Sequence, residues 1–309
     1  MGIQILDTQH LGRPGIIAAI ALETEEGIAL FDTGPASTFD KISQAMERAG
    51  FSPNDVRQVF LSHIHLDHAG AAWRFASLGA TIHVHPRGAH HLVDPSRLME
   101  SATRIFGEEM ERLWGEMRPI PSSQVRVTED NGLIRAGEFE VRALATPGHA
   151  SHHNAYQWND NIFGGDAAGV RLDGGPPVPP FVPPELQIES WLESIARLRS
   201  LGATRLYLPH FGLVEGNLAA HFEALTERVR RWADWFRDEL RQGRAQTELV
   251  PDFAAYEARD IIESGAAPER VSDYERADPS FMAVTASIRY WQKYHPEALG
   301  ASVPDPRSA

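Results

Sequence analysis

Short apolar runs alternate with amphipathic segments over the first third of the chain. Residues 16–22 and 28–31 are apolar, β-rich runs separated by a polar turn, which predicts a β-hairpin. Residues 39–49 carry apolar side chains at helical spacing and end before Gly50, which predicts a helix. A strand, a helix and a strand are expected next, over residues 56–61, 69–78 and 81–84. This alternation favours layers of helices and sheets over an all-β fold.

A helical insert is expected at about residues 86–121. Within it, one apolar stripe repeats every three or four residues, formed by Met99, Ala102, Phe106, Met110, Leu113, Trp114 and Met117. A stripe of this kind predicts an amphipathic helix over residues 95–118 that packs on the core. Its flexible Met side chains would also suit a lid over an apolar pocket, and a stripe left exposed would suit a homodimer interface.

The remaining two thirds divide into strands and then helices. Strands are expected at residues 125–128, 139–145, 155–158, 161–163 and 205–208, with a helix at 188–201. The proline-rich segment 174–184 predicts an extended loop. Only helices follow, at 218–242, 253–264 and 280–294, and then a frayed tail at 301–309. We therefore predict a layered domain over residues 1–217 and a helical C-terminal region over 218–309.

The most informative segment follows the strand predicted at residues 56–61. His63, His65, Asp67 and His68 lie within six residues, between that strand and the next helix. Residues two apart on an extended segment point the same way, so His63 and His65 can bind one ion together. Asp67 and His68 come where the chain turns into the helix and can face a second ion. Imidazole and carboxylate ligands suit zinc, and also iron or manganese.

Three further candidates lie at the ends of predicted strands. His149, Asp166 and His210 each follow such a strand within a turn that contains Gly or Pro. Taken singly, each segment reads as a turn. Taken together, they supply the His, Asp and His that a two-metal site requires after the first cluster. Four other histidines, His83, His85, His90 and His91, have no partner in any motif and are expected at the surface or at a pocket rim.

In these motifs the chain resembles the metallo-β-lactamase superfamily over about residues 5–215. The resemblance implies an α/β (α+β) fold, an αββα sandwich with metals at one edge, here with a helical insert and a C-terminal helical region. It implies that His63, His65 and His149 bind a first ion, that Asp67, His68 and His210 bind a second, and that Asp166 bridges them. It also implies that Asp32 supports the ligands without binding metal itself. A weaker match to the family implies the same role for His153.

The amino-acid composition limits the kinds of molecule that this protein is expected to bind. The formal charge is −13, from 29 Lys and Arg against 42 Asp and Glu, which argues against a protein that coats nucleic acid. The absence of cysteine excludes disulfides, thiolate ligands and a cysteine nucleophile. No apolar run approaches the roughly 20 residues of a membrane span, and the N-terminal segment does not read as a secretory signal. We expect a cytoplasmic protein with no membrane partner.

Two divalent ions about 3.5–4 Å apart can share one hydroxide. We therefore predict a hydrolase with two zinc ions per chain, similar to the hydroxyacylglutathione hydrolase branch, which cleaves a thioester or related acyl ester of a small molecule. Asp67 would orient the hydroxide, and Phe106, Trp114 and Phe181 would line the pocket. Two alternatives stay open: a lactonase on the same fold, and a persulfide dioxygenase with a single iron.

Overall fold

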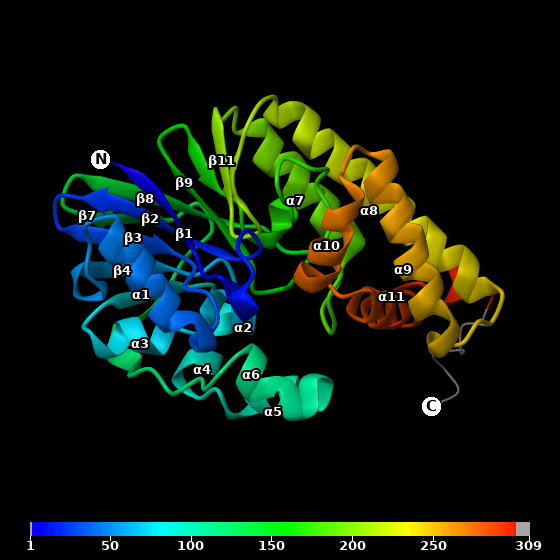
Figure 1. Ribbon diagram of the computed structural model, residues 1–309, viewed down its shortest axis with the longest axis horizontal. Helices are drawn as coiled ribbons and strands as arrows, with labels where there is room; N and C mark the ends of the chain where they lie inside the picture. The colour runs from blue at the N-terminus through cyan, green and yellow to red at the C-terminus, as the bar shows by residue number, and fades with distance from the viewer. Residues whose placement is uncertain (1, 301–309) are drawn as a thin grey trace, which may run out of the picture.

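The computed structural model describes residues 2–300, so the predicted frayed tail at 301–309 lies outside the described residues. Two six-stranded sheets lie face to face, and helices cover the outer face of each (Figure 1). The predicted αββα sandwich is confirmed. No helix within residues 2–300 combines the length and the apolar character needed to cross a bilayer.

The first sheet contains the N-terminal strands in chain order. Its strands are β1 (Ile3–Asp7), β2 (Ala18–Thr24), β3 (Gly27–Phe31), β4 (Val56–Phe60), β5 (Thr81–Val84) and β6 (Val125–Val127). The predicted hairpin is β2 with β3, and β3 to β6 run parallel. The sequence did not predict β1, because this edge strand is only partly buried and its apolar pattern is weak.

The second sheet is formed by the strands that follow. In spatial order they are β12 (Gly212–Val214), β11 (Arg205–Leu208), β10 (Asn161–Phe163), β9 (Asn154–Trp158), β8 (Phe139–Ala145) and β7 (Leu133–Ala136). Strands β7 and β12 were not predicted, since each is an edge strand of three or four residues. Strands β10 and β11 run parallel, so their carboxyl ends lie at the same edge of the sheet.

Aromatic side chains fill the space between the sheets. Phe31 and Phe60 from the first sheet pack against Tyr156 and Phe163 from the second, and the Phe31 and Phe163 rings are stacked with centroids 3.5 Å apart. Alternate residues of β2 point to opposite faces, so Ile20 enters this central layer while its neighbours pack against the outer helices. The two sheets therefore form one rigid support for the loops at their ends.

Short helices cover the first sheet. They are α1 (Phe39–Arg48), α2 (Leu66–Ala69), α3 (Ala72–Ser77) and, in the insert, α4 (Pro86–Val93), α5 (Ser96–Phe106) and α6 (Met110–Leu113). The single helix predicted over 95–118 is wrong, because Gly107 adopts a left-handed φ of 53° and ends α5. Its apolar stripe still packs inward: Ala102, Met110 and Met117 are buried in the core beneath the first sheet.

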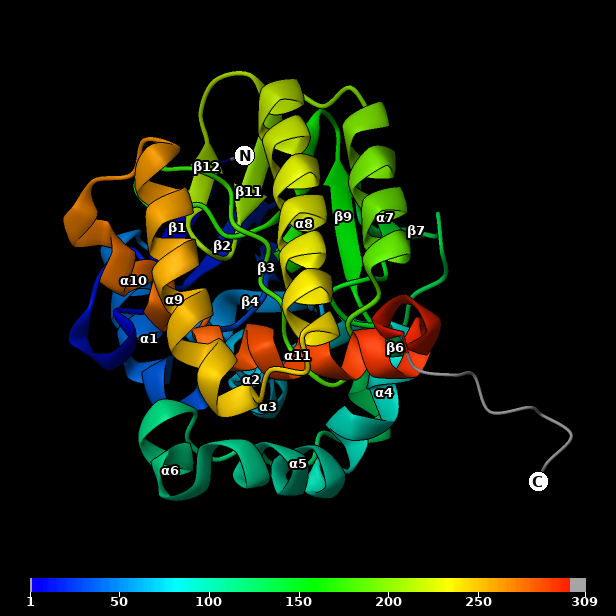
Figure 2. The ribbon, with the colours of Figure 1, turned by 90° about the vertical axis from the view of Figure 1, so that its right-hand side faces the viewer.

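The remaining helices, most of them longer, cover the second sheet. They are α7 (Ile188–Ser200), α8 (Leu218–Arg241), α9 (Gln246–Glu263), α10 (Val271–Ala277) and α11 (Ser280–Tyr294). Figure 2 shows α7 and α8 side by side over this sheet, with α9 to the left of α8 and α11 crossing below the lower ends of α8 and α9. Side chains of α7, α8, α9 and α11 share one hydrophobic cluster with the second sheet. The predicted division into a domain over residues 1–217 and a helical region over 218–309 stays a prediction. The helical region shares its hydrophobic core with the second sheet.

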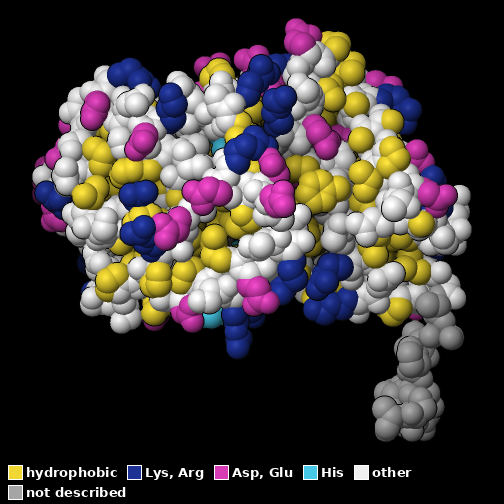
Figure 3. All heavy atoms as spheres, turned by 60° about the horizontal axis from the view of Figure 1, so that its bottom comes forward, with side chains coloured by type: hydrophobic (Ala, Val, Ile, Leu, Met, Phe, Trp, Pro, Cys, Tyr) yellow, Lys and Arg dark blue, Asp and Glu magenta, His cyan; other side chains and the backbone are white. Residues whose placement is uncertain are grey.

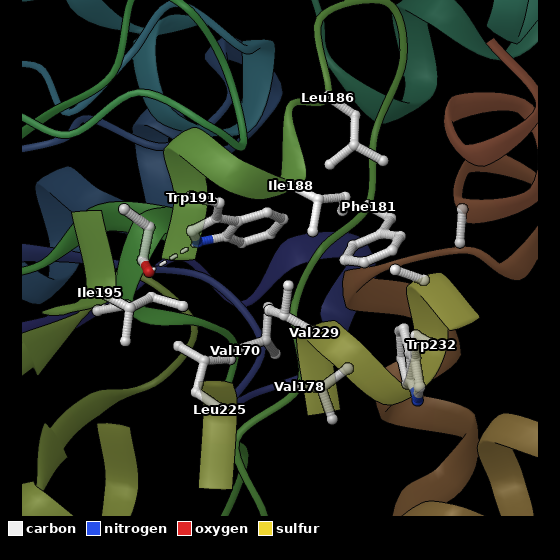
Figure 4. Close-up of a cluster of buried hydrophobic side chains, with 14 of the residues drawn as sticks. Val170, Val178, Phe181, Leu186, Ile188, Trp191, Ile195, Leu225, Val229 and Trp232 are labelled. Atoms are coloured by element: carbon white, nitrogen blue, oxygen red, sulfur yellow. Dashed lines mark hydrogen bonds between the residues drawn. The ribbon is translucent and has the colours of Figure 1, made fainter. Parts of the chain in front are cut away.

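Phe181 belongs to this cluster, which corrects the prediction that it lines a pocket. Its side chain is fully buried between the rings of Trp191 and Trp232, at centroid distances of 5.7 and 5.8 Å (Figure 4). The proline-rich loop packs against α8, where Arg228 donates a hydrogen bond to the Pro177 carbonyl and Phe181 joins the same hydrophobic cluster as the α8 side chains. Trp191 also donates a hydrogen bond from its indole nitrogen to the Ala167 carbonyl, at 2.9 Å.

A buried carboxyl on α9 should make stability depend on pH. Burial raises the pKa of Glu257 to about 8, with help from Glu275 and Asp260, while Ser280 and Arg228 act in the opposite direction. Asp278 is a further acidic side chain near Glu257, and burial raises its pKa as well. Folded Glu257 keeps a proton that the unfolded chain releases above about pH 4.5, so its stabilising contribution is complete below that pH and is lost as pH rises through 8.

We expect Glu257→Gln to raise the free energy of unfolding relative to the wild type at pH 8, by at least about 1.4 kcal/mol, and to change it much less at pH 5. The measurement is urea unfolding at both pH values. Glu263→Gln, on the exposed side of α9, is the control and should show no such difference. Equal effects of Glu257→Gln at the two pH values would contradict this assignment.

Candidate metal centre

Four loops at one edge of the sandwich bring the predicted ligands together. The loop after β4 carries His63, His65 and the start of α2, and the loop after β8 carries His149. Asp166 and His210 follow β10 and β11, whose carboxyl ends meet at this edge. These segments are far apart in the chain, and the sheet order alone makes them neighbours.

Three imidazoles form the first group of donors. His63 Nε2 lies 2.8 Å from His65 Nδ1, and His149 Nε2 lies 3.3 and 3.1 Å from those two atoms. His149 donates from Nδ1 to the Pro180 carbonyl at 2.8 Å, which leaves its Nε2 lone pair facing the group. A zinc ion with Zn–N bonds of about 2.0–2.1 Å in tetrahedral geometry holds its nitrogens about 3.3 Å apart. The three imidazoles therefore fit a shared ion.

The second group has one carboxylate and two imidazoles. Asp67 Oδ2 lies 3.3 Å from His68 Nε2 and 3.4 Å from His210 Nε2, and the two imidazole nitrogens are 3.4 Å apart. His68 Nδ1 contacts Asp32 at 3.0 Å, and His210 donates from Nδ1 to the Ile16 carbonyl at 2.9 Å. Both Nε2 atoms therefore face the centre, so this group also fits a metal ion.

Asp166 reaches both groups. Its Oδ2 lies 3.5 Å from His149 Nε2 in the first group and 3.4 Å from His68 Nε2 in the second. Its Oδ1 is buried, has no hydrogen-bond partner among residues 2–300, and lies 3.8 Å from His210 Nε2. A buried carboxylate oxygen without a donor is costly unless a cation balances it. Asp166 is thus placed as the carboxylate that two ions would share.

Burial and mutual contact set the charges of these groups. Burial and the neighbouring imidazoles lower the pKa of His63 well below its usual value, which keeps this ligand neutral and able to bind a cation. Burial alone would raise the pKa of Asp166, but His68 and His210 lower it overall, so this carboxyl is ionised. Figure 3 shows only small patches of histidine on the face that it presents, as expected from the burial of the ligands.

Asp32 contacts the second group and holds it in position, as the resemblance implied. Its carboxylate accepts hydrogen bonds from the Ser62 backbone at 2.7 Å and from the Ser62 hydroxyl at 2.8 Å, in addition to its contact with His68. Ser62 in turn contacts His63 Nδ1 at 3.0 Å. One carboxylate therefore orients a ligand of each group.

His153 positions the loop that carries Asp166. Its Nε2 accepts a hydrogen bond from the Ala167 backbone at 3.2 Å, so its Nδ1 carries the proton and donates to Thr146 Oγ1 at 2.8 Å. Both ring nitrogens are engaged, and His153 is a support rather than a ligand. Gly165 lies against this ring with a φ of 54°, and a Cβ there would come within 2.4 Å of Nε2.

The structure corrects or extends several predictions from the sequence. His83 is buried and not at the surface: its ring stacks on Phe60 and its Nε2 lies 2.6 Å from Gln58 Oε1. His10 and His152, which the sequence analysis missed, are also buried near the centre. His152 could have been noticed beside His153, whereas His10 is an isolated histidine that no motif marks.

The comparisons with known proteins agree with this geometry. A family model described as the metallo-beta-lactamase superfamily matches residues 12–210, a span that contains all seven candidate ligands. The chain therefore belongs to the metallo-β-lactamase superfamily.

Relatives share the fold at low identity. The metallo-beta-lactamase fold-containing protein ST1585 of Sulfurisphaera tokodaii is 29% identical over 160 residues, which cover 50% of this chain and 60% of that protein. The chain thus matches about 60% of the length of this curated relative.

Three solved structures have a fold similar to that of this chain. The ST1585 crystal structure has a TM-score of 0.59 at 22% identity, over 74% of this chain and 98% of its own. TTHA1429 from Thermus thermophilus, described as a metallo-beta-lactamase family protein, has a TM-score of 0.62 at 20% identity, over 94% and 93% of the two chains. The metallo-beta-lactamase SMB-1 has a TM-score of 0.54 at 19% identity, over 74% and 92%. At these identities, the likeness concerns the fold.

Proposed function

We propose that this protein is a metal-dependent hydrolase that holds two divalent cations, zinc in the first instance, and cleaves a thioester or related acyl ester of a small molecule. The observation that carries the proposal is the pair of donor groups joined by Asp166. His63, His65 and His149 would hold one cation, and Asp67, His68 and His210 the other. Two such cations polarise a carbonyl and make water a nucleophile at neutral pH.

Side chains of the site would orient the attacking water and hold the ligands in place. The Asp67 side chain is 19% exposed, against 5% or less for Asp166, His63, His68 and His210, so it faces the side from which substrate arrives. Its carboxylate would accept a hydrogen bond from the attacking water and orient it toward the acyl carbon. Asp32 and His153 would keep the ligands in place during the reaction, because their hydrogen bonds fix His68 and the Asp166 loop.

A second candidate is supported by a different set of donors. His63, His68 and Asp166 also lie within binding distance of one another. Two histidines and one carboxylate are the usual ligands of a non-haem iron oxygenase. A persulfide dioxygenase with one iron therefore remains the alternative. The lactonase alternative uses the same two-metal chemistry, and only substrates separate it from a thioesterase.

The decisive experiment combines metal analysis with a substrate panel. We expect purified protein to contain two zinc ions per chain and to hydrolyse at least one member of a panel of thioesters, lactones and phosphodiesters. Removal of the metal with a chelator should abolish turnover, and two equivalents of zinc should restore it. One iron per chain, together with oxygen consumption on a persulfide, would instead establish the dioxygenase.

A further inference from the structure

An aromatic pair lies outside the family motifs. His10 is in the loop that joins β1 to β2, and Trp114 follows α6 in the helical insert. The His10 and Trp114 rings are stacked with centroids 5.4 Å apart and planes inclined by 11°. Only 5% of His10 is exposed. Two segments separated by about a hundred residues thus meet in one defined contact.

Hydrogen bonds from neighbouring residues fix the segments that carry His10 and Trp114. The Asp7 carboxylate accepts hydrogen bonds from the backbones of Gln9 and Gly15, at 2.8 and 2.9 Å, and so fixes the loop around His10. Arg13 ties the same loop to α10 through Asp273, at 2.8 Å.

On the other side, Ser37 donates from its backbone to the Trp114 carbonyl at 3.1 Å and from its hydroxyl to the Leu113 carbonyl at 2.7 Å. The stacked rings are therefore held in place by both segments before any ligand binds.

The pair lies beside the second group of metal ligands. The loop of His10 continues to Ile16, whose carbonyl orients His210. After burial, the charges that most affect the pKa of His10 are those of Asp67, His210 and Arg112. His10 therefore lies within electrostatic reach of His210 and of Asp67, the ligand that faces the arriving substrate.

Each ring carries a polar atom without a partner. His10 Nδ1 and Trp114 Nε1 are both buried and make no hydrogen bond with any residue from 2 to 300. Indole is a donor only, and a neutral imidazole has one donor nitrogen. Buried polar groups of this kind normally have a partner, and those left open in a folded protein call for a ligand or water. With its proton on Nδ1, His10 gives the pair two N–H donors, and two such donors suit an acceptor with two oxygens, namely a carboxylate.

We propose that His10 and Trp114 form a subsite that binds a carboxylate on the acyl group of the substrate, next to the metal centre. This inference rests on the proposed hydrolase function and narrows its substrate class to acyl esters or thioesters that carry a second, anionic group. Neither residue belongs to the ligand motifs. The subsite exists because the insert brings Trp114 against the first loop.

The test compares two thioesters of N-acetylcysteamine, malonyl and isovaleryl, which differ by a carboxylate in place of an isopropyl group. We expect the zinc-loaded wild type to have a kcat/KM about 10-fold or more higher for the malonyl thioester. His10→Phe and Trp114→Phe keep an aromatic ring and remove the N–H. Each should lower kcat/KM for the malonyl thioester about 10-fold, mainly through KM, and leave the isovaleryl value within about twofold.

Three further measurements separate binding from a structural role. His10→Asn keeps a donor and should retain much of the malonyl preference, while His295→Phe, at the end of α11, should behave as the wild type. Zinc content and melting temperature should be unchanged in all variants. Equal losses for both thioesters, or an unchanged preference in both Phe variants, would overturn the proposal.

Failure of the proposed function can be told apart from failure of the subsite. If the wild type cleaves neither thioester, the hydrolase proposal fails for this substrate class. The subsite is then tested by calorimetric titration of zinc-loaded protein with malonate. His10→Phe should weaken malonate binding about 10-fold relative to the wild type and to His295→Phe. Equal affinity in all three proteins would overturn the subsite.

Discussion

Asp166→Asn is expected to lower hydrolytic turnover about a thousand-fold or more and to reduce the bound metal below two ions per chain. The substitution keeps the shape of the side chain but removes the charge that both donor groups share. Loss of one ion removes several kcal/mol of stabilisation of the transition state, which corresponds to a loss of that size. The measurement is kcat with the best thioester, together with elemental analysis of the same sample.

The control for this prediction is Asp40→Asn, which changes an exposed carboxylate on α1 and should keep full activity and metal. His65→Ala should resemble Asp166→Asn, because it removes a nitrogen that lies within 3.1 Å of two other donors. A variant at Asp166 that kept two zinc ions and wild-type kcat would show that this carboxylate does not bridge the donor groups. The role of Asp166 as the carboxylate shared by the two ions would then have to be abandoned.

Phe181→Ala is expected to lower the free energy of unfolding by about 3–5 kcal/mol, because it leaves a cavity between Trp191 and Trp232 (Figure 4). The measurement is the denaturant midpoint, with the slope of the transition as a check that the folding mechanism is unchanged. Phe281→Ala, on a side chain of α11 that is 37% exposed, should change stability by no more than about 0.5 kcal/mol.

This substitution also decides between the two interpretations of Phe181. A pocket residue would raise KM and leave stability nearly unchanged, whereas a core residue lowers stability at constant KM. The structure favours the second result, since no part of the ring is exposed. A stable Phe181→Ala protein with a raised KM would return this residue to the substrate pocket.

Local pattern was a good guide to the regular elements and a poor one to their ends. The hairpin of β2 and β3 and the helix α1 were predicted because each has a clear apolar period and a turn or stop signal. The edge strands β1, β7 and β12 were missed because an edge needs few buried side chains. Helix α9 begins at Gln246, before the predicted start at 253, because Glu248 caps its first turn through Ala245 despite the proline at 251.

The candidate metal ligands also differ in how well local pattern predicted them. His63, His65, Asp67 and His68 were evident from spacing alone, since a short segment fixes the relative directions of its side chains. His149, Asp166 and His210 were marked only by their shared position at the ends of predicted strands, because each taken singly looks like an ordinary turn residue, and the resemblance to a family then assigned their roles. His10 and Trp114 could not be paired at all from the sequence, as their contact depends on how the insert packs against the first loop.

The sequence by itself determined the kinds of donor available, the layered fold and the position of the compact His and Asp motif. Those properties depend on residue type and on short-range periodicity, which the chain carries before it folds. The tertiary structure alone decided that Asp166 touches both donor groups, that Phe181 is core, and that His10 faces Trp114. These are contacts between distant segments, set by sheet order and by packing across the whole domain, and no local pattern encodes them.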